Sequence, residues 1–230
     1  MSVLLNLKSI GKRFGFRNIL NEINFSIDNG EFVMLIGNNG AGKSTLLRII
    51  SSLMRPSSGE ITFRGMKQKD NLNEWLRIMG SMSHEDRLYS DLNSKDNLRL
   101  YGTLYNVKQL NYKIDDILEK IDLKHVANLS IRNFSSGMKK RLMIGRLMLH
   151  NPEILILDEP FTGLDQNSFR WFQEYLRNFH YKGGTVLMVT HQLQIGLDLA
   201  SRVLVLNKQN IKHDISSVDL SVEHCNYLLQ

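Results

Sequence analysis

Short apolar runs alternate with helix-compatible segments along most of the chain. The run Phe32–Ile36 is too short and too rich in strand-forming residues for a helix, so it predicts a buried strand, and residues 46–50 then resume a helix-compatible pattern. Similar short apolar runs return at residues 153–157, 185–190 and 203–206. This alternation predicts an α/β fold in which helices separate the strands of a sheet.

Two stretches depart from this alternation. Residues 1–30 contain short strand-like runs around a turn, which predicts an antiparallel β flap. From about residue 72 to residue 150 helical patterns dominate: Ser94 has the position of a helix cap, and four residues recur at the spacing of a single helix face. These four are Ile114, Ile117, Leu118 and Ile121. We therefore expect one domain with a core at about residues 1–80 and 151–210, a helical subdomain at about 81–150, and a polar tail at 211–230.

The segment between the first buried strand and the first helix fits the pattern G-x-x-x-x-G-K-[ST]. Its residues are Gly37, Asn38, Asn39, Gly40, Ala41, Gly42, Lys43, Ser44 and Thr45. Glycines let backbone N–H groups turn towards a phosphate, and the helix start that follows adds a partial positive charge. Lys43 is then placed to reach the β- and γ-phosphates, and the Ser44 hydroxyl to bind Mg²⁺. The setting of strand, glycine-rich loop and helix predicts the core of a P-loop NTPase.

Two carboxylates follow the strand at 153–157. Asp158 is placed to hold Mg²⁺ through its water shell, and Glu159 is placed to orient or deprotonate the attacking water. Adjacent side chains alternate sides on a strand, so both face the nucleotide only if the strand ends there, and Pro160 indicates that it does. The alternative, a pair of acidic surface residues, becomes weak once the phosphate loop is considered.

Two further residues are candidates for contact with the nucleotide. His191, directly after the strand at 185–190, is placed to donate a hydrogen bond to the γ-phosphate, although such a histidine is also common as a structural residue. Phe14 lies 23 positions before Gly37, which in the predicted flap is close enough to stack on a purine. A lone phenylalanine is also common in a core.

Composition narrows the classes of protein that remain. The chain has 230 residues, 42% of them hydrophobic, which suits one large α/β domain. No apolar run approaches the roughly 18 residues of a membrane span, and the first residues do not resemble a signal peptide. Cys225 is the only cysteine, so no internal disulfide is expected. The net charge of +6 allows anionic partners, but the basic run at 139–141 has no aromatic residues beside it, so nucleic-acid binding is not expected.

Residues 133–141 resemble the signature motif of ATP-binding-cassette (ABC) ATPases, commonly Leu-Ser-Gly-Gly-Gln. Ser135 and Gly137 are kept, whereas Phe134, Ser136 and Met138 are departures. The segment 162–165 resembles the D-loop of the family, His191 its switch histidine, and Phe14 its adenine-stacking aromatic. The matching motifs run in the family order over about residues 3 to 207. The resemblance implies an ABC ATPase architecture: a RecA-like P-loop core with an antiparallel β flap and a helical subdomain that carries the signature.

The family resemblance also implies how the chain works. Two cassettes pack head to tail in the presence of ATP, and the signature of one closes over the γ-phosphate held by the loop of the other. The residues implied in this closure are Ser135, Ser136, Gly137 and Met138 of the signature, with Asp165 of the D-loop. ATP hydrolysis then lets the pair separate. The implied partners are polytopic membrane subunits, with the cassette bound peripherally at the cytoplasmic face of the membrane.

A departure from the family pattern narrows the subfamily. The family usually has a glutamine that contacts Mg²⁺ and the membrane partner, and the matching residue here is His84. A protonated imidazole would be repelled by Mg²⁺, so we predict weaker coupling at low pH. The segments 84–92 and 97–105, together with residues 135–138, resemble the cytochrome c maturation ATPases that are named haem exporters.

Three alternatives stay open at this point. The chain is similar to other export ATPases that carry a different cargo. Soluble ABC ATPases, such as those of iron–sulfur assembly, share the same core motifs. A P-loop kinase is disfavoured because it leaves residues 135–138 and His191 without a role.

Overall fold

The computed structural model describes residues 2–83 and 88–229. Its central element is a six-stranded sheet in the order β10-β9-β3-β8-β7-β6. Neighbouring strands are parallel except for β10, which is antiparallel to β9. The strands are β3 (Phe32–Ile36), β6 (Met79–Met82), β7 (Ile154–Asp158), β8 (Thr185–Val189), β9 (Arg202–Asn207) and β10 (Asn210–Ser216). The α/β architecture expected from the alternation is confirmed.

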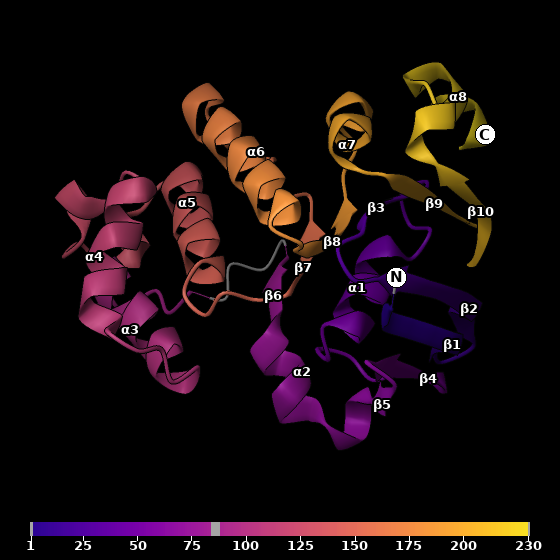
Figure 1. The fold of residues 1–230 in the computed structure, drawn as a ribbon, viewed down its shortest axis with the longest axis horizontal. Helices are drawn as coiled ribbons and strands as arrows, with labels where there is room; N and C mark the ends of the chain where they lie inside the picture. The colour runs from indigo at the N-terminus through magenta and orange to yellow at the C-terminus, as the bar shows by residue number, and fades with distance from the viewer. Residues whose placement is uncertain (1, 84–87, 230) are drawn as a thin grey trace.

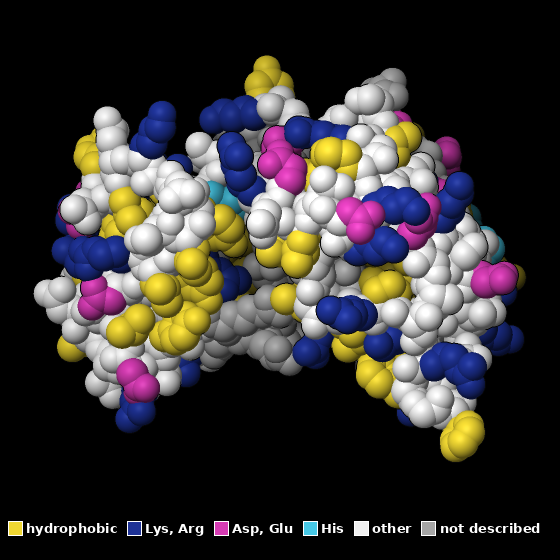
Figure 2. Space-filling view, turned by 90° about the horizontal axis from the view of Figure 1, so that it is seen from below, with side chains coloured by type: hydrophobic (Ala, Val, Ile, Leu, Met, Phe, Trp, Pro, Cys, Tyr) yellow, Lys and Arg dark blue, Asp and Glu magenta, His cyan; other side chains and the backbone are white. Residues whose placement is uncertain are grey.

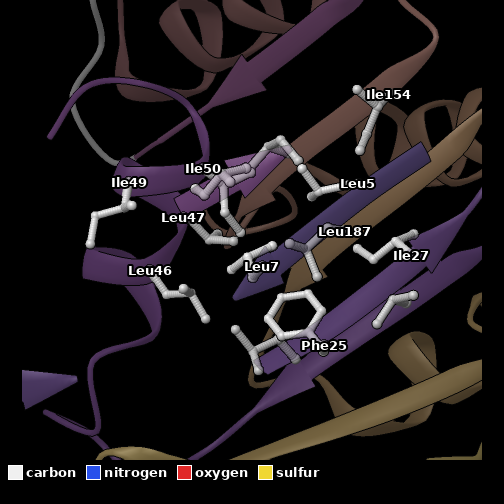
Figure 3. Packing of buried hydrophobic residues seen from close by; sticks show 14 of the residues in the cluster. Leu5, Leu7, Phe25, Ile27, Leu46, Leu47, Ile49, Ile50, Ile154 and Leu187 are labelled. Atoms are coloured by element: carbon white, nitrogen blue, oxygen red, sulfur yellow. The ribbon is translucent and has the colours of Figure 1, made fainter. Parts of the chain in front are cut away.

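A second sheet of four strands, in the order β2-β1-β4-β5, forms the predicted antiparallel flap. Its strands are β1 (Val3–Phe14), β2 (Arg17–Asp28), β4 (Ser58–Phe63) and β5 (Met66–Lys67). Helix α1 (Lys43–Ile50) lies between the two sheets. In Figure 3 Leu5 and Phe25 of the flap, Leu47 of α1 and Leu187 of β8 belong to a single buried cluster. Each such side chain contributes roughly 1.5–3 kcal/mol by leaving water, so this cluster fixes α1 and the loop before it.

The other face of the central sheet is covered by α6 (Gln166–Tyr181), α7 (Leu193–Leu199) and α8 (Val222–Leu228) (Figure 1). Phe172 and Leu176 of α6 and Cys225 of α8 are fully buried there, in a cluster that also includes Met34 and Met188 of the sheet. The segment expected to be a tail therefore contains a paired strand, β10, and a helix with a buried residue. Its polar sequence gave no sign of this, because β10 is an edge strand with little buried surface.

A separate lobe is formed by α3 (Ser94–Leu104), α4 (Leu110–Lys120) and α5 (Ser136–Leu147) (Figure 1). Short 3₁₀ turns lie at Gln68–Asp70, Lys124–Val126, Ile131–Asn133 and Ser217–Asp219. The four residues predicted to share a face of α4 or its end are each at most 1% exposed, which confirms that prediction. Figure 2 shows this lobe beside a hollow, with hydrophobic side chains gathered on the side of the lobe that borders it.

Two local predictions in this region are corrected. The cap of α3 is Asn93, whose side chain accepts a hydrogen bond from the Asp96 N–H, whereas Ser94 is the first helical residue and donates to the Ala127 carbonyl at 3.1 Å. Helices dominate after residue 72, as predicted, but the prediction omitted a strand. After α2 (Leu72–Ile78), strand β6 pairs in parallel with β7, and a Cβ on its Gly80 would lie 2.8 Å from Leu155 Cδ2. So short a strand, with a glycine inside, lacks a sequence signal.

None of the helices in the described ranges combines the length and the apolar character that crossing a bilayer requires.

Candidate functional site

A cavity of about 410 Å³ lies where the carboxyl ends of β3, β7 and β8 meet. This edge is where ligands bind in open α/β sheets. The lining residues are Arg17, Ile19, Asn39, Gly40, Gly42, Lys43, Ser44, Thr45, Asp158, Glu159, Val189 and His191. The structure therefore brings together most of the predicted phosphate loop, both predicted carboxylates and His191, which come from distant parts of the sequence. Three predicted loop residues are not among the lining residues: Gly37, Asn38 and Ala41.

The glycines of the loop have backbone conformations that other residues would strain to adopt. Gly42 has φ of 106° and Gly40 has φ of 78°. A Cβ on Gly42 would also lie 2.8 Å from Leu20 Cδ2, so the flap packs closely against the loop. Gly42 caps α1 without a side-chain hydrogen bond, which leaves the N–H groups of the first helical turn free to bind an anion.

Lys43 is 8% exposed, and its ammonium donates to the carbonyls of Gly37 at 2.6 Å and of Asn38 at 3.1 Å. Burial lowers the pKa of Lys43 from its ordinary value of 10.5, while the charges of Glu159 and Asp158 act in the opposite direction. The ammonium has three N–H donors, and two of them are given to loop carbonyls, which a charged phosphate can replace as the stronger acceptor.

Glu159 is held in an unusual backbone conformation at the end of β7. Its φ is 48°, its N–H donates to the Val189 carbonyl at 2.9 Å, and its own carbonyl accepts from the Lys140 ammonium at 2.9 Å. This left-handed turn ends the strand and lets both Asp158 and Glu159 line the cavity, as expected from Pro160.

Glu159 is buried, with 7% of the residue exposed, and the two oxygens of its carboxylate differ in their hydrogen bonds. Oε2 accepts from the backbone N–H of His191 at 3.3 Å. Oε1 is buried and has no hydrogen-bond partner among the described residues, with His191 Nε2 at 3.6 Å. A buried acceptor without a partner is costly, so this oxygen is poised to accept a hydrogen bond from a water in the cavity.

Ser44 and Asp158 both line the same cavity. A hydroxyl and a carboxylate are hard oxygen donors of the kind that Mg²⁺ prefers. The residues present therefore fit the predicted magnesium site. His84, predicted as a further metal and catalytic residue, lies outside the described residues.

Three lining residues were not predicted as site residues from the sequence: Val189 of β8 and two residues of the flap. Arg17 and Ile19, at the start of β2, line the cavity from the flap side. The predicted aromatic residue, Phe14, is 51% exposed and is not among the lining residues; the Lys12 ammonium lies 5.1 Å from its ring centroid. A basic residue three positions after Phe14 was the available signal, but only the turn of the flap decides which side chain faces the cavity.

The signature residues Ser135, Ser136, Gly137 and Met138 do not line the cavity. Ser135 caps α5, accepting a hydrogen bond from the Met138 N–H at 3.2 Å, and both Ser135 and Ser136 are exposed. Asp165 caps α6 in the same way, and hydrogen bonds from Ser168 hold the pKa of Asp165 below its ordinary value. Within one chain, Ser135 and Asp165 therefore cap the starts of α5 and α6, which face solvent.

The chain is similar in sequence to known ATP-binding proteins of ABC transporters. A family model described as ABC transporter matches residues 20–162. The chain is 31% identical to an uncharacterized ABC transporter ATP-binding protein, YdbJ of Bacillus subtilis, over 93% of this chain and 69% of the relative. It is 36% identical to the lantibiotic transport ATP-binding protein SrtF of Streptococcus pyogenes, over 83% of this chain and 81% of the relative. The Nod factor export ATP-binding protein I of Rhizobium johnstonii is 34% identical over 89% of this chain, which spans 66% of that relative.

Solved structures give the same result for the fold. A structure described as the ATP-binding subunit of an ABC transporter superposes with a TM-score of 0.91 at 28% identity, covering 99% of this chain and 100% of the other. A dimeric, post-hydrolysis cassette bound to ADP and phosphate, MJ0796, superposes with a TM-score of 0.84 at 25% identity, covering 93% and 99% of the two chains.

Proposed function

This chain belongs to the ABC transporter family as an ATP-binding subunit that hydrolyses ATP, and we propose that it drives an exporter by closing head to tail on a second cassette. The proposal rests on one observation about the cavity. Oε1 of Glu159, which has no hydrogen-bond partner within residues 2–83 and 88–229, lies 3.6 Å from Nε2 of His191, and both residues line the cavity together with Lys43. A phosphate site and a general base in one cavity are what hydrolysis of a phosphoanhydride requires.

The chemistry assigned to this cavity is in-line attack of water on the γ-phosphoryl group: the water oxygen bonds to the γ-phosphorus while the bond from that phosphorus to the bridging oxygen breaks, and ADP and phosphate leave. Lys43 leaves the loop carbonyls to bind the β- and γ-phosphates, and loop N–H groups bind the remaining phosphate oxygens. Glu159 Oε1 orients the attacking water and accepts its proton, while His191 donates to the γ-phosphate. Ser44 and Asp158 would hold Mg²⁺, which when bound would neutralise charge on the phosphate oxygens.

The second copy supplies what the cavity lacks. The Ser135 hydroxyl, the Gly137 N–H and the positive end of the α5 dipole are proposed to close over the γ-phosphate held by the other chain, with Asp165 near the shared boundary. The exposure of Ser135 and Asp165 and the dimeric form of a similar cassette support this proposal. ATP then acts as part of the interface, and its hydrolysis weakens the interface.

The cargo is the finer part of the proposal. The named relatives transport lantibiotics or export Nod factors, which favours an export ATPase. Within this class we favour the haem exporter of cytochrome c maturation, because residues 97–105 and 135–138 resemble that group. The proposed partners are polytopic membrane subunits, and the proposed location is the cytoplasmic face of the membrane.

The test is to purify the tagged chain from gently solubilised membranes and to identify what accompanies it by mass spectrometry. The Glu159→Gln variant is the matched control, because binding to a membrane partner does not require turnover. Recovery of both forms with a polytopic protein and haem-handling proteins supports the haem exporter. A polytopic partner with a different cargo system retains the exporter and rejects haem, and recovery only in the soluble fraction, beside iron–sulfur assembly proteins, overturns the proposal.

A further inference from the structure

We propose that Asn38 is a positioning residue that ties the phosphate loop to helix α8, so that docking of α8 and binding of ATP strengthen each other. The proposal rests on the proposed role of Gly37–Thr45 as the loop that binds ATP. It adds a part of the chain, residues 220–229, that the chemistry of the cavity does not use.

The side chain of Asn38 points away from the cavity. Its Nδ2 donates to the backbone carbonyl of Leu229 at 2.7 Å, across 191 positions of sequence, and Asn38 is absent from the cavity lining although Asn39 and Gly40 belong to it. The backbone carbonyl of the same residue accepts from Lys43 Nζ at 3.1 Å. Asn38 is therefore bonded on one side to the lysine of the phosphate site and on the other to the last turn of α8.

Helix α8 is docked by a small apolar contact. Cys225 is fully buried in the cluster that includes Met34 and Ile36 of β3, and Leu220, Leu228 and Leu229 pack against that cluster while partly exposed. Figure 1 shows α8 beside α7, near the end of the sheet formed by β9 and β10. Strand β3 leads directly into the phosphate loop, so the surface on which α8 rests and the loop that Asn38 belongs to are continuous.

This geometry couples the two events. A glycine-rich loop is conformationally free, and fixing it for phosphate binding has an entropic cost, which the anchor on α8 reduces in advance. A bond that helps α8 dock also helps the loop bind ATP, and by linkage ATP must stabilise the docked helix by the same factor. One such hydrogen bond corresponds to a change of about three- to tenfold in an equilibrium constant.

The only cysteine of the chain supplies a direct readout. Because Cys225 is fully buried, a thiol reagent such as Ellman's reagent reacts with it only when α8 opens, so the rate of labelling reports the opening equilibrium. In the unaltered protein, ATP with Mg²⁺ is expected to slow labelling about three- to tenfold. In Asn38→Ala, labelling without ATP becomes faster and ATP no longer slows it. Equal labelling of the two proteins, or equal protection by ATP, overturns the proposal.

A double-mutant cycle separates coupling from local damage. Leu228→Asp weakens docking of α8 without touching the loop, and it is expected to lower ATP affinity about as much as Asn38→Ala does. Combining the two substitutions should cause little further loss, because both break the same link. Val218→Asp, an exposed residue just before α8, controls for the added charge, and Asn178→Ala on α6 controls for loss of an exposed asparagine bond. Additive losses of affinity overturn the proposal.

Lys43→Ala distinguishes this inference from the proposed function. If Lys43→Ala keeps normal ATP affinity, the assignment of the phosphate loop fails and the coupling fails with it. If Lys43→Ala loses ATP binding while Asn38→Ala changes neither labelling nor affinity, the proposed function stands and only the link to α8 is rejected.

Discussion

The cavity at the ends of β3, β7 and β8 and the start of α5 carry groups for one proposed reaction, but they are built differently. In the cavity the reactive groups are buried: Lys43, Asp158 and Glu159 are each at most 8% exposed. At the start of α5, Ser135 and Ser136 are exposed, and the Ser135 hydroxyl serves the helix by accepting the Met138 N–H. A buried site can be completed by its own chain, whereas an exposed helix start needs a partner surface to exclude water. Four substitutions test this division, in order of expected effect.

Glu159→Gln should have the largest effect. The amide cannot accept a proton from water, so turnover is expected to fall about 100- to 10,000-fold while ATP binding is kept. Phosphate release measures turnover, and size-exclusion chromatography in saturating ATP should show an accumulated dimer. Glu153, a half-buried glutamate that pairs with Arg64 just before the same strand, provides the matched control: Glu153→Gln should keep normal turnover. A Glu159→Gln protein that stays monomeric with ATP would count against the shared site.

Lys43→Ala should impair the binding of ATP, the step before hydrolysis. It removes charge-assisted hydrogen bonds worth about 3 kcal/mol in all, which corresponds to a roughly 100-fold loss of ATP affinity. Isothermal titration calorimetry measures this directly. Lys108→Ala removes an exposed lysine of the helical lobe and should leave the affinity unchanged. Normal affinity in Lys43→Ala would place the phosphates elsewhere.

Ser135→Ala should distinguish the role of the α5 start from that of the cavity. Binding of ATP to a single chain should be unaffected, whereas ATP-dependent dimerisation and turnover should fall about tenfold, because a hydroxyl that contacts the γ-phosphate is lost. Loss of the helix cap also lowers stability by about 1 kcal/mol. Asn93→Ala removes the cap of α3 at a similar cost and should leave dimerisation intact. If the two variants dimerise equally well, Ser135 is only a cap.

His150→Gln should have the smallest effect and concerns the junction between the regions. His150 follows α5, and its ring stacks on Tyr105, the residue after α3; its Nε2 lies 3.1 Å from the Met79 carbonyl of β6. Burial lowers its pKa below the ordinary value of 6.5; the Met79 hydrogen bond acts against this, and nearby Lys113 and Arg146 add to it. The folded protein therefore binds this proton less readily than the unfolded chain does.

The sign of the pH dependence follows from that difference. The contribution of neutral His150 to stability is complete above about pH 6.5, and it declines as the pH falls from there towards the lower folded-state pKa. The melting temperature followed between about pH 5 and pH 8 should fall less steeply at low pH in His150→Gln than in the unaltered protein. The exposed His213→Gln is the control and should keep the original slope. An unchanged slope in His150→Gln would show that His150 does not report on the junction.

The features that could be predicted from the sequence are those that depend on residues close together in the chain. Gly37–Thr45, Asp158 and Glu159 could be proposed as site residues because their chemistry depends on residue types at fixed short spacing. The buried face of α4 followed from the helical repeat of Ile114 and Ile117. The helix cap at Asn93 was misplaced by one residue, since asparagine and serine are both good caps and only the Asp96 N–H decides between them.

Contacts between segments far apart in the chain could not be predicted from the sequence. Strand β6 exists because β7 offers it a partner, Arg17 and Ile19 line the cavity because the flap turns towards it, and Asn38 meets Leu229 across most of the chain. Local backbone preferences and short spacings were enough to predict the glycine-rich loop, the paired carboxylates and the succession of strands and helices. Which of these groups share a cavity and which face outward could be seen only in the folded chain. That outcome depends on packing between distant segments, whose free energy is not a property of any one segment.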